Sequence, residues 1–275
     1  MLRLPAGNAR TTTTNQRGDH DESIGPGDRP PATGRDPMSG VKSAVHAVRS
    51  YIRRAPGTFT WLAILLVTTV VLTHLSPEDT RVVLGNRSTN LHHLREDPVR
   101  VLITSAFWLS GGGWIWYVVL YNLFHVPAER WLGTLRWLAV VVTAHVGATY
   151  LSQGVLYWAI RHGHAPAQAV FTLDVGVSYA LAGVVAVLAY RIARPWCFAY
   201  SAGVVVYYAI PLLENLTFTD IGHFTALLIG FACYPLTRGR PALERHPLPL
   251  LRSADHKADR GIRPGYPYRE RKWWA

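Results

Sequence analysis

Six long apolar segments lie between two polar ends of this chain. They cover approximately residues 59–75, 112–128, 137–156, 170–190, 196–213 and 220–237. A helix needs about 17–25 mostly apolar residues to cross the hydrocarbon core of a membrane, so each segment is long enough or nearly long enough to span it. Within lipid, helices satisfy their own backbone hydrogen bonds. The sequence therefore predicts an all-α polytopic membrane protein with six transmembrane helices.

The two ends of the chain differ in composition from this apolar middle. Residues 1–40 are rich in Thr, Gly, Pro, Asp and Arg without apolar clusters, which predicts a disordered N-terminal tail. Residues 41–58 form a basic amphipathic lead-in, residues 59–237 the membrane domain, and residues 238–275 a basic C-terminal tail, also expected to be disordered. Met38 is the only methionine after Met1, so translation starting at either residue is open.

The distribution of positive charge predicts the orientation in the membrane. Residues 1–58 carry +4 and residues 238–275 carry +6 of the net charge of +11. Arginines in the short connections after the second and fourth segments fall on the same side, which the positive-inside rule makes cytoplasmic. We therefore expect both termini to lie in the cytoplasm and the protein to reside in a bacterial plasma membrane. The basic tails are expected to contact anionic lipid, and no nucleic-acid-binding motif accompanies them.

The opposite side carries one long connection at about residues 76–111. Its second half alternates polar and bulky apolar residues, a pattern typical of a helix that lies at the membrane surface. A loop that only contacts the headgroups explains the same pattern equally well.

Two short polar strings stand at the start of the fourth and sixth apolar segments. They are DVGVS, from Asp174 to Ser178, and DIGH, from Asp220 to His223. Such side chains are costly in lipid unless they pair or line a cavity, so they mark a candidate site. A serine and a histidine on two spans suit a nucleophile and its general base. The structural alternative is helix packing for Ser178 and His223, and helix capping for the two aspartates.

Helical spacing places small residues on the same faces as these polar groups. The face of the fourth segment holds Asp174, Ser178, Ala182 and Ala186, and that of the sixth holds Asp220, His223, Ala226 and Gly230. Small residues allow two membrane helices to approach closely. Packing of these two faces is therefore expected to bring Ser178 toward His223.

These residues resemble the rhomboid family of intramembrane serine proteases over about residues 59–237. The family has a serine on its fourth helix in a GxSG setting, which Gly176-Val177-Ser178 matches at its first three positions. It also has a histidine on its sixth helix followed by small residues, as at His223, and the string ERWLGT at residues 129–134 is similar to its ERxxGS signature. The resemblance implies a six-helix rhomboid-like bundle. It also implies a serine-type endopeptidase that cleaves transmembrane or juxtamembrane substrates with Ser178 and His223 as catalytic residues.

The chain departs from the family pattern in two places. Tyr179 follows the serine where the family usually has glycine, and aligning the string YALAG at residues 179–183 with a similar family string places the serine position on Val175 instead. The second helix also lacks the His and Asn, four residues apart, that help to stabilise the oxyanion in active members. The remaining supporting or oxyanion candidates are Gly176, Asp174, Asp220, Tyr117 and Asn122.

Three functions are compatible with these patterns. The first is a rhomboid-like protease acting through a Ser178/His223 dyad. The second is a catalytically inactive rhomboid-like protein that binds or chaperones transmembrane segments. The third is a small transporter using Asp174, Asp220 and His223, which ranks last because no inverted repeat is visible. Neither a metal nor an organic cofactor is implied, and the expected partners are transmembrane substrate or client segments and anionic lipid.

Overall fold

The computed structural model describes residues 37–111, 113–214 and 216–243, and this part of the chain is helical without strands. The two predicted disordered tails therefore lie largely outside the described residues. The chain separates into two compact units at His46, and the packing below concerns the second unit, from Ala47 onward.

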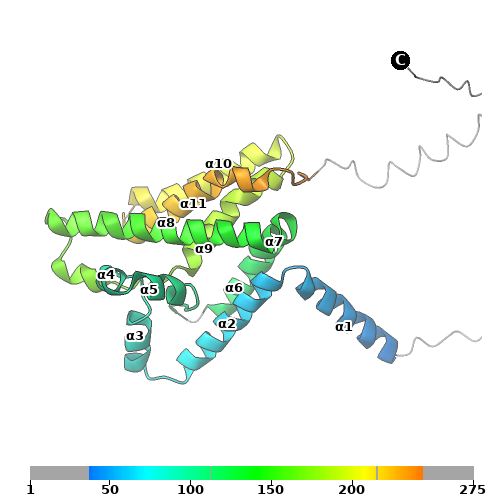
Figure 1. The fold of residues 1–275 in the computed structure, drawn as a ribbon, viewed down its shortest axis with the longest axis horizontal. Helices are drawn as coiled ribbons and strands as arrows, with labels where there is room; N and C mark the ends of the chain where they lie inside the picture. The colour runs from blue at the N-terminus through cyan, green and yellow to red at the C-terminus, as the bar shows by residue number, and fades with distance from the viewer. Residues whose placement is uncertain (1–36, 112, 215, 244–275) are drawn as a thin grey trace, which may run out of the picture. The chain divides into compact units, whose positions relative to one another are not determined.

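Figure 1 shows the order of the helices along the chain. They are α1 (Pro37–Arg53), α2 (Pro56–Thr73), α3 (Pro77–Gly85), α4 (Leu91–Glu96), α5 (Pro98–Ser105), α6 (Trp114–Leu120), η1 (Tyr121–His125), α7 (Val126–Leu132), α8 (Thr134–Arg161), η2 (Ala167–Phe171), α9 (Val177–Val187), η3 (Leu188–Arg191), α10 (Trp196–Glu214), α11 (Phe218–Ala232) and η4 (Tyr234–Thr237). The element η1 is a single π-helical turn within the second apolar segment, between α6 and α7.

Three of these helices, α2, α8 and α10, are long and apolar enough to cross a membrane. They correspond to the first, third and fifth predicted spans. The fourth and sixth correspond to the shorter apolar helices Val177–Arg191 and Phe218–Ala232, and the second is divided among α6, η1 and α7. The all-helical architecture is thus confirmed, and the count of six complete spans stays a prediction.

The centre of the bundle is the packing of α8, α9 and α11 against one another. Small residues make this packing possible. A Cβ atom added to Gly230 of α11 would overlap the carbonyl oxygen of Gly183 in α9 and crowd Ala186. Ala182 and Ala226 are fully buried in the same region. The small-residue faces predicted for the fourth and sixth segments therefore do pack together, as membrane helices commonly do.

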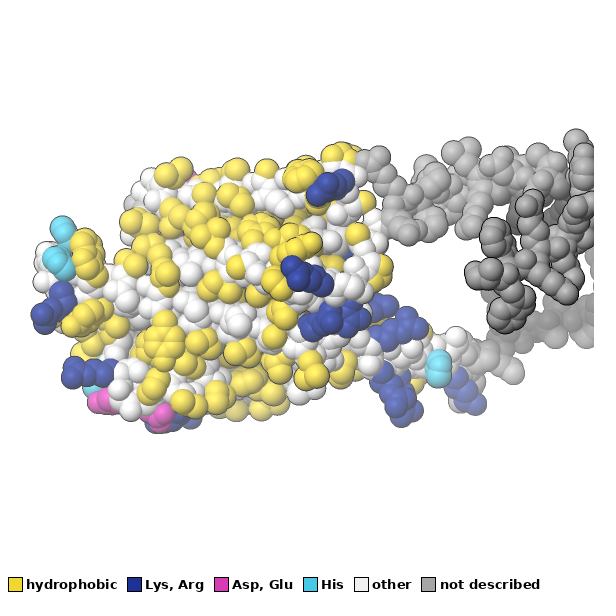
Figure 2. Space-filling view, turned by 45° about the horizontal axis from the view of Figure 1, so that its top comes forward, with side chains coloured by type: hydrophobic (Ala, Val, Ile, Leu, Met, Phe, Trp, Pro, Cys, Tyr) yellow, Lys and Arg dark blue, Asp and Glu magenta, His cyan; other side chains and the backbone are white. Residues whose placement is uncertain are grey.

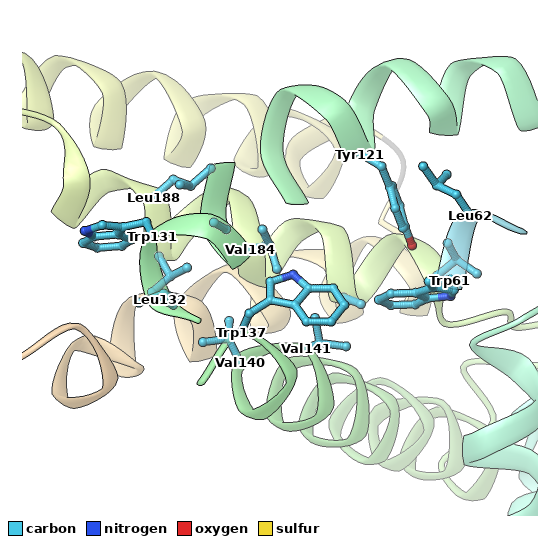
Figure 3. Close-up of a cluster of buried hydrophobic side chains, with 14 of the residues drawn as sticks. Trp61, Leu62, Tyr121, Trp131, Leu132, Trp137, Val140, Val141, Val184 and Leu188 are labelled. Atoms are coloured by element: carbon cyan, nitrogen blue, oxygen red, sulfur yellow. The ribbon is translucent and has the colours of Figure 1, made fainter. Parts of the chain in front are cut away.

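A second packing centre is aromatic (Figure 3). The Trp61 ring of α2 lies edge-on to Tyr121 of η1, with 5.3 Å between ring centroids, and to Trp137 of α8, at 6.1 Å. Such edge-to-face pairs contribute roughly 0.5–1.5 kcal/mol each beyond the area they bury. Trp131 and Leu132 of α7 belong to the same cluster. The cluster holds the second apolar segment between α2 and α8.

The string ERWLGT forms a joint between helices. The carboxylate of Glu129 accepts hydrogen bonds from the backbone N–H groups of Gly57, at 2.9 Å, and Thr58, at 2.7 Å. It also accepts the hydroxyl hydrogens of Thr58 and Thr134, at 2.7 and 2.8 Å. The first N–H groups of a helix have no partner within it, and a negative charge there is favourable. Glu129 therefore fixes the start of α2 to the start of α8.

The long connection after the first span is helical, in agreement with the surface-helix pattern, and consists of α3, α4 and α5. It is tied to the chain just before α9. The N–H of Asp174 donates to Ser88 Oγ at 2.7 Å, and the N–H of Thr89 donates to the Asp174 carbonyl oxygen at 2.9 Å. These bonds connect the loop to the segment that carries the first polar string.

Candidate functional site

Ser178 and His223 line one cavity of about 440 Å³. The cavity lies among α6, α9, α10 and α11, and most of its wall is apolar or aromatic. Its polar groups come from Ser178, Asp220 and His223 and from tyrosines that include Tyr117 and Tyr208. The two polar strings, which are far apart in sequence, thus contribute to a single site.

Ser178 lies in the first turn of α9 and is half-buried. Its side of the helix continues with Leu181, which lines the same cavity. Within the described residues, no hydrogen bond joins the Ser178 hydroxyl to His223. The dyad therefore stays a prediction, although both members border the same space.

His223 packs against two tyrosine rings. Its ring centroid lies 5.1 Å from that of Tyr179, at 72°, and 6.1 Å from that of Tyr208. Tyr179 is fully buried and packs closely on Gly222, where an added Cβ would come within 2.6 Å of the tyrosine hydroxyl. Successive residues of a helix are turned by about 100°. The face of α9 that meets the histidine is therefore the one that carries Tyr179, and Ser178 borders the cavity beside it.

Asp220 has the capping role expected for it. The Thr217 hydroxyl oxygen accepts from the Asp220 N–H at 3.2 Å, and the Asp220 carboxylate accepts from the Thr217 N–H at 3.1 Å. This reciprocal arrangement is a capping box, which satisfies two open N–H groups at the start of α11. Since Asp220 also borders the cavity, its charge lies three residues before His223 on the same helix.

Asp174 does not cap α9, which corrects the capping interpretation of this residue. The N-cap position is held by Gly176 without a side-chain bond. The Asp174 carboxylate is instead buried and accepts a hydrogen bond from Gln153 Nε2 of α8 at 2.9 Å. Asp174 therefore connects α8 with the loop and with the start of α9.

Gly176 has a packing role. It lies so close to the imidazole of His145 in α8 that an added Cβ would overlap the ring. The Gly176 N–H donates to the Ser105 carbonyl oxygen at 3.3 Å, so this N–H is already bonded and does not face the cavity as a free oxyanion donor. Glycine at this position allows α9 to begin against α8 and α5.

The two candidates on the second apolar segment lie in different places. Tyr117 lines the cavity with Ser178. Asn122 donates to the Val118 carbonyl oxygen at 2.8 Å and accepts from the Tyr51 hydroxyl at 3.0 Å, and it borders a separate cavity next to Arg130. A π-helical turn shifts the helical register, and Asn122 lies within that turn.

The two tyrosines that pack against His223, Tyr179 and Tyr208, were not predicted as members of the site. Tyr179 appeared in the sequence only as a departure from the family pattern. Tyr208 lies in the apolar string VVVYYAIP of α10, where an aromatic side chain facing a cavity has the same sequence signature as one facing lipid. Only the packing of α10 beside α11 distinguishes the two cases.

A family model described as "Rhomboid-like protein" matches residues 50–243. No curated protein and no solved structure matches the chain. The matched range includes α2 through η4 and therefore both Ser178 and His223.

Proposed function

Because this chain belongs to the rhomboid-like protein family, we propose that it is an integral membrane protein that binds transmembrane or juxtamembrane segments of other proteins in the Ser178/His223 cavity. The observation that carries the proposal is the composition of the cavity. Its apolar and aromatic walls suit the side chains of a membrane segment, and its hydroxyl and imidazole groups can bond backbone groups of a segment that is not fully helical.

In this proposal all six apolar segments cross the membrane and both termini face the cytoplasm. The starts of α9 and α11, and with them the cavity, then lie toward the opposite side. The helix α10 contributes Tyr207, Tyr208 and Pro211 to the cavity and has no fully buried residue among those described. Because few packed contacts oppose its displacement, α10 is the side from which a segment would enter.

Binding without cleavage is the function that this geometry supports best. Tyr179 packs edge-on against the His223 ring, and no hydrogen bond within the described residues joins Ser178 to that ring, although a serine protease needs its nucleophile within hydrogen-bond reach of the base. Of the oxyanion candidates, Gly176 and Asn122 are bonded to other groups, whereas Tyr117 borders the cavity. Loss of one oxyanion donor already costs about a hundredfold or more in rate.

Cleavage through the Ser178/His223 dyad is the second candidate, and the shared cavity favours it. His223 would accept the hydroxyl proton as Ser178 Oγ attacks the scissile carbonyl carbon. The protonated imidazole would then give this proton to the leaving amine as the peptide bond breaks. A water molecule would hydrolyse the resulting ester, with its proton passing through His223 and back to Ser178. This chemistry requires Ser178 Oγ to come within about 3 Å of the ring.

Segment binding predicts site-specific crosslinking. With the photoreactive residue benzoylphenylalanine in place of Tyr208, we expect crosslinks to partner proteins at residues inside or next to their transmembrane segments, as read by mass spectrometry. The matched control is the same replacement of Tyr150, an exposed tyrosine on α8. Equal crosslinking from both positions, or crosslinks to lipid alone, would contradict a segment-binding cavity.

A fluorophosphonate probe separates the two candidates. We expect no labelling of the purified protein above that of Ser178→Ala, because the hydroxyl is not activated by the imidazole. Labelling that is lost in both Ser178→Ala and His223→Ala, but kept in the control Ser201→Ala of α10, would replace binding by cleavage as the function. The crosslinking pattern from Tyr208 is compatible with either result, so the two experiments test separate statements.

A further inference from the structure

Five arginines surround two adjoining cavities at the end of the bundle away from the Ser178/His223 site. The cavities have volumes of about 650 and 560 Å³ and share Trp131, Arg240 and Ala242 in their walls. The arginines are Arg130, Arg191, Arg194, Arg238 and Arg240. They come from α7, from η3 and the connection that follows it, and from the chain after η4.

The cavities have fixed walls, because residues 238–243 fold back over this end of the bundle. The indole N–H of Trp131 donates to the Pro241 carbonyl oxygen at 2.8 Å. The Leu243 N–H donates to the Arg191 carbonyl oxygen at 2.7 Å, and the Arg240 guanidinium donates to the Leu132 carbonyl oxygen. The arginines are therefore held around a defined space.

Within the described residues, no carboxylate forms an ion pair with Arg130, Arg191 or Arg240, the three arginines that border the smaller cavity. Arg130 lies over the Tyr51 ring at 5.7 Å, and Arg191 donates to the Pro127 carbonyl oxygen at 3.3 Å. Both of these guanidinium groups border the smaller cavity, where their like charges repel each other. The nearest acid in sequence, Glu129, uses both oxygens at the joint between α2 and α8. In Figure 2, Lys and Arg lie at both ends of an apolar face, whereas Asp and Glu are visible only at the end opposite this cluster.

The surroundings of the cluster are apolar and aromatic. Phe198 and Tyr234 border the larger cavity and are exposed, and Trp196 next to it is 69% exposed. Guanidinium groups bind phosphate oxygens with paired, charge-assisted hydrogen bonds. Aromatic residues at the ends of membrane helices prefer the headgroup region. A ligand that combines a phosphate with hydrocarbon chains matches both halves of this site, whereas a free anion matches only one.

We propose that these two cavities form a binding site for an anionic phospholipid. The phosphate lies among Arg130, Arg191 and Arg240, where its charge relieves their repulsion, and the acyl chains extend past Phe198 along α10. Basic pockets between membrane helices bind such headgroups in general. This site is separate from the Ser178/His223 cavity, and the proposal does not depend on whether that cavity binds or cleaves a segment.

Native mass spectrometry of the full-length protein in detergent tests the site. The protein is delipidated and then incubated with either dioleoylphosphatidylglycerol, which is anionic, or dioleoylphosphatidylcholine, which is zwitterionic. We expect it to retain only the phosphatidylglycerol. The double variant Arg130→Gln/Arg191→Gln should weaken this retention on the order of tenfold or more. The matched control is Arg81→Gln/Arg95→Gln in α3 and α4, which removes the same charge from the opposite end and should retain the lipid as the unchanged protein does.

Three results would overturn the proposal. The first is equal retention of both lipids, and the second is an equal loss of phosphatidylglycerol retention in the control variant and in Arg130→Gln/Arg191→Gln. The third is displacement of the phosphatidylglycerol by millimolar inorganic phosphate, which would indicate a site for a free anion. Should the double variant fail to fold, Arg238→Gln provides the second test, because Arg238 lines the larger cavity and its side chain makes no hydrogen bond within the described residues. Undiminished retention in a folded Arg238→Gln protein would also count against the site.

Discussion

Gly230→Ala should destabilise the protein by about 3 kcal/mol or more, because overpacking between backbones cannot be relieved by a side-chain rotation. The new methyl group would overlap the Gly183 carbonyl oxygen and crowd Ala186, so α9 and α11 would have to separate. That separation would also move Tyr179 away from His223 and open the floor of the cavity. Unfolding of the purified protein in detergent, followed by its tryptophan fluorescence, measures the loss of stability.

Two other glycines provide matched controls for this substitution. Gly203 of α10 and Gly154 of α8 have no atom within 4 Å of an added Cβ. Because alanine favours helix over glycine by about 1 kcal/mol, Gly203→Ala and Gly154→Ala should leave stability unchanged or raise it slightly. Similar losses in all three variants would show that the contact between α9 and α11 is not the cause.

Glu129→Ala should cost about 3–5 kcal/mol, since it leaves buried hydrogen-bond donors without an acceptor. The donors are the N–H groups of Gly57 and Thr58 and the hydroxyls of Thr58 and Thr134. The loss falls on the joint that fixes the start of α2 to the start of α8. Hydrogen exchange at residues 57–60 should therefore increase together with the drop in the unfolding midpoint.

The matched control is Glu78→Ala in α3, an exposed carboxylate near the start of a helix. Its removal should change stability by less than about 1 kcal/mol, because an exposed charge at a helix end contributes only about 0.3–1 kcal/mol. Glu129→Gln should lie between wild type and Glu129→Ala. It keeps one acceptor oxygen but turns an NH₂ group toward other donors. Equal stability of Glu129→Ala and Glu78→Ala would contradict the joint.

The length of the apolar segments was enough to predict the helical membrane architecture. It located α2, α8 and α10 to within a few residues, and the small residues Ala226 and Gly230 correctly indicated the face on which α11 packs. The π-helical turn η1 was not predictable, because it depends on packing between helices, such as the contact of Tyr121 with Trp61 of α2, at 5.3 Å between ring centroids. No local propensity encodes that contact.

Helical periodicity predicted the candidate site only to the accuracy of one helix face. It correctly predicted that Ser178 and His223 border the same space. Neighbouring residues of a helix differ by about 100° in direction, so the periodicity did not decide whether Ser178 or Tyr179 contacts the His223 ring. The cap at Asp220 was predictable because its partner Thr217 is local. The role of Asp174 was not predictable, because its hydrogen-bond partner Gln153 lies on another helix.

The joint at Glu129 also has a consequence for the order of synthesis. The acceptor for the first N–H groups of α2 is supplied by a residue that follows 71 positions later in the chain. At ribosomal rates this delay is on the order of ten seconds. During this interval the start of α2 has only water or lipid headgroups as partners. The first helix of the bundle to leave the ribosome is therefore fixed in place only after α7 has been made.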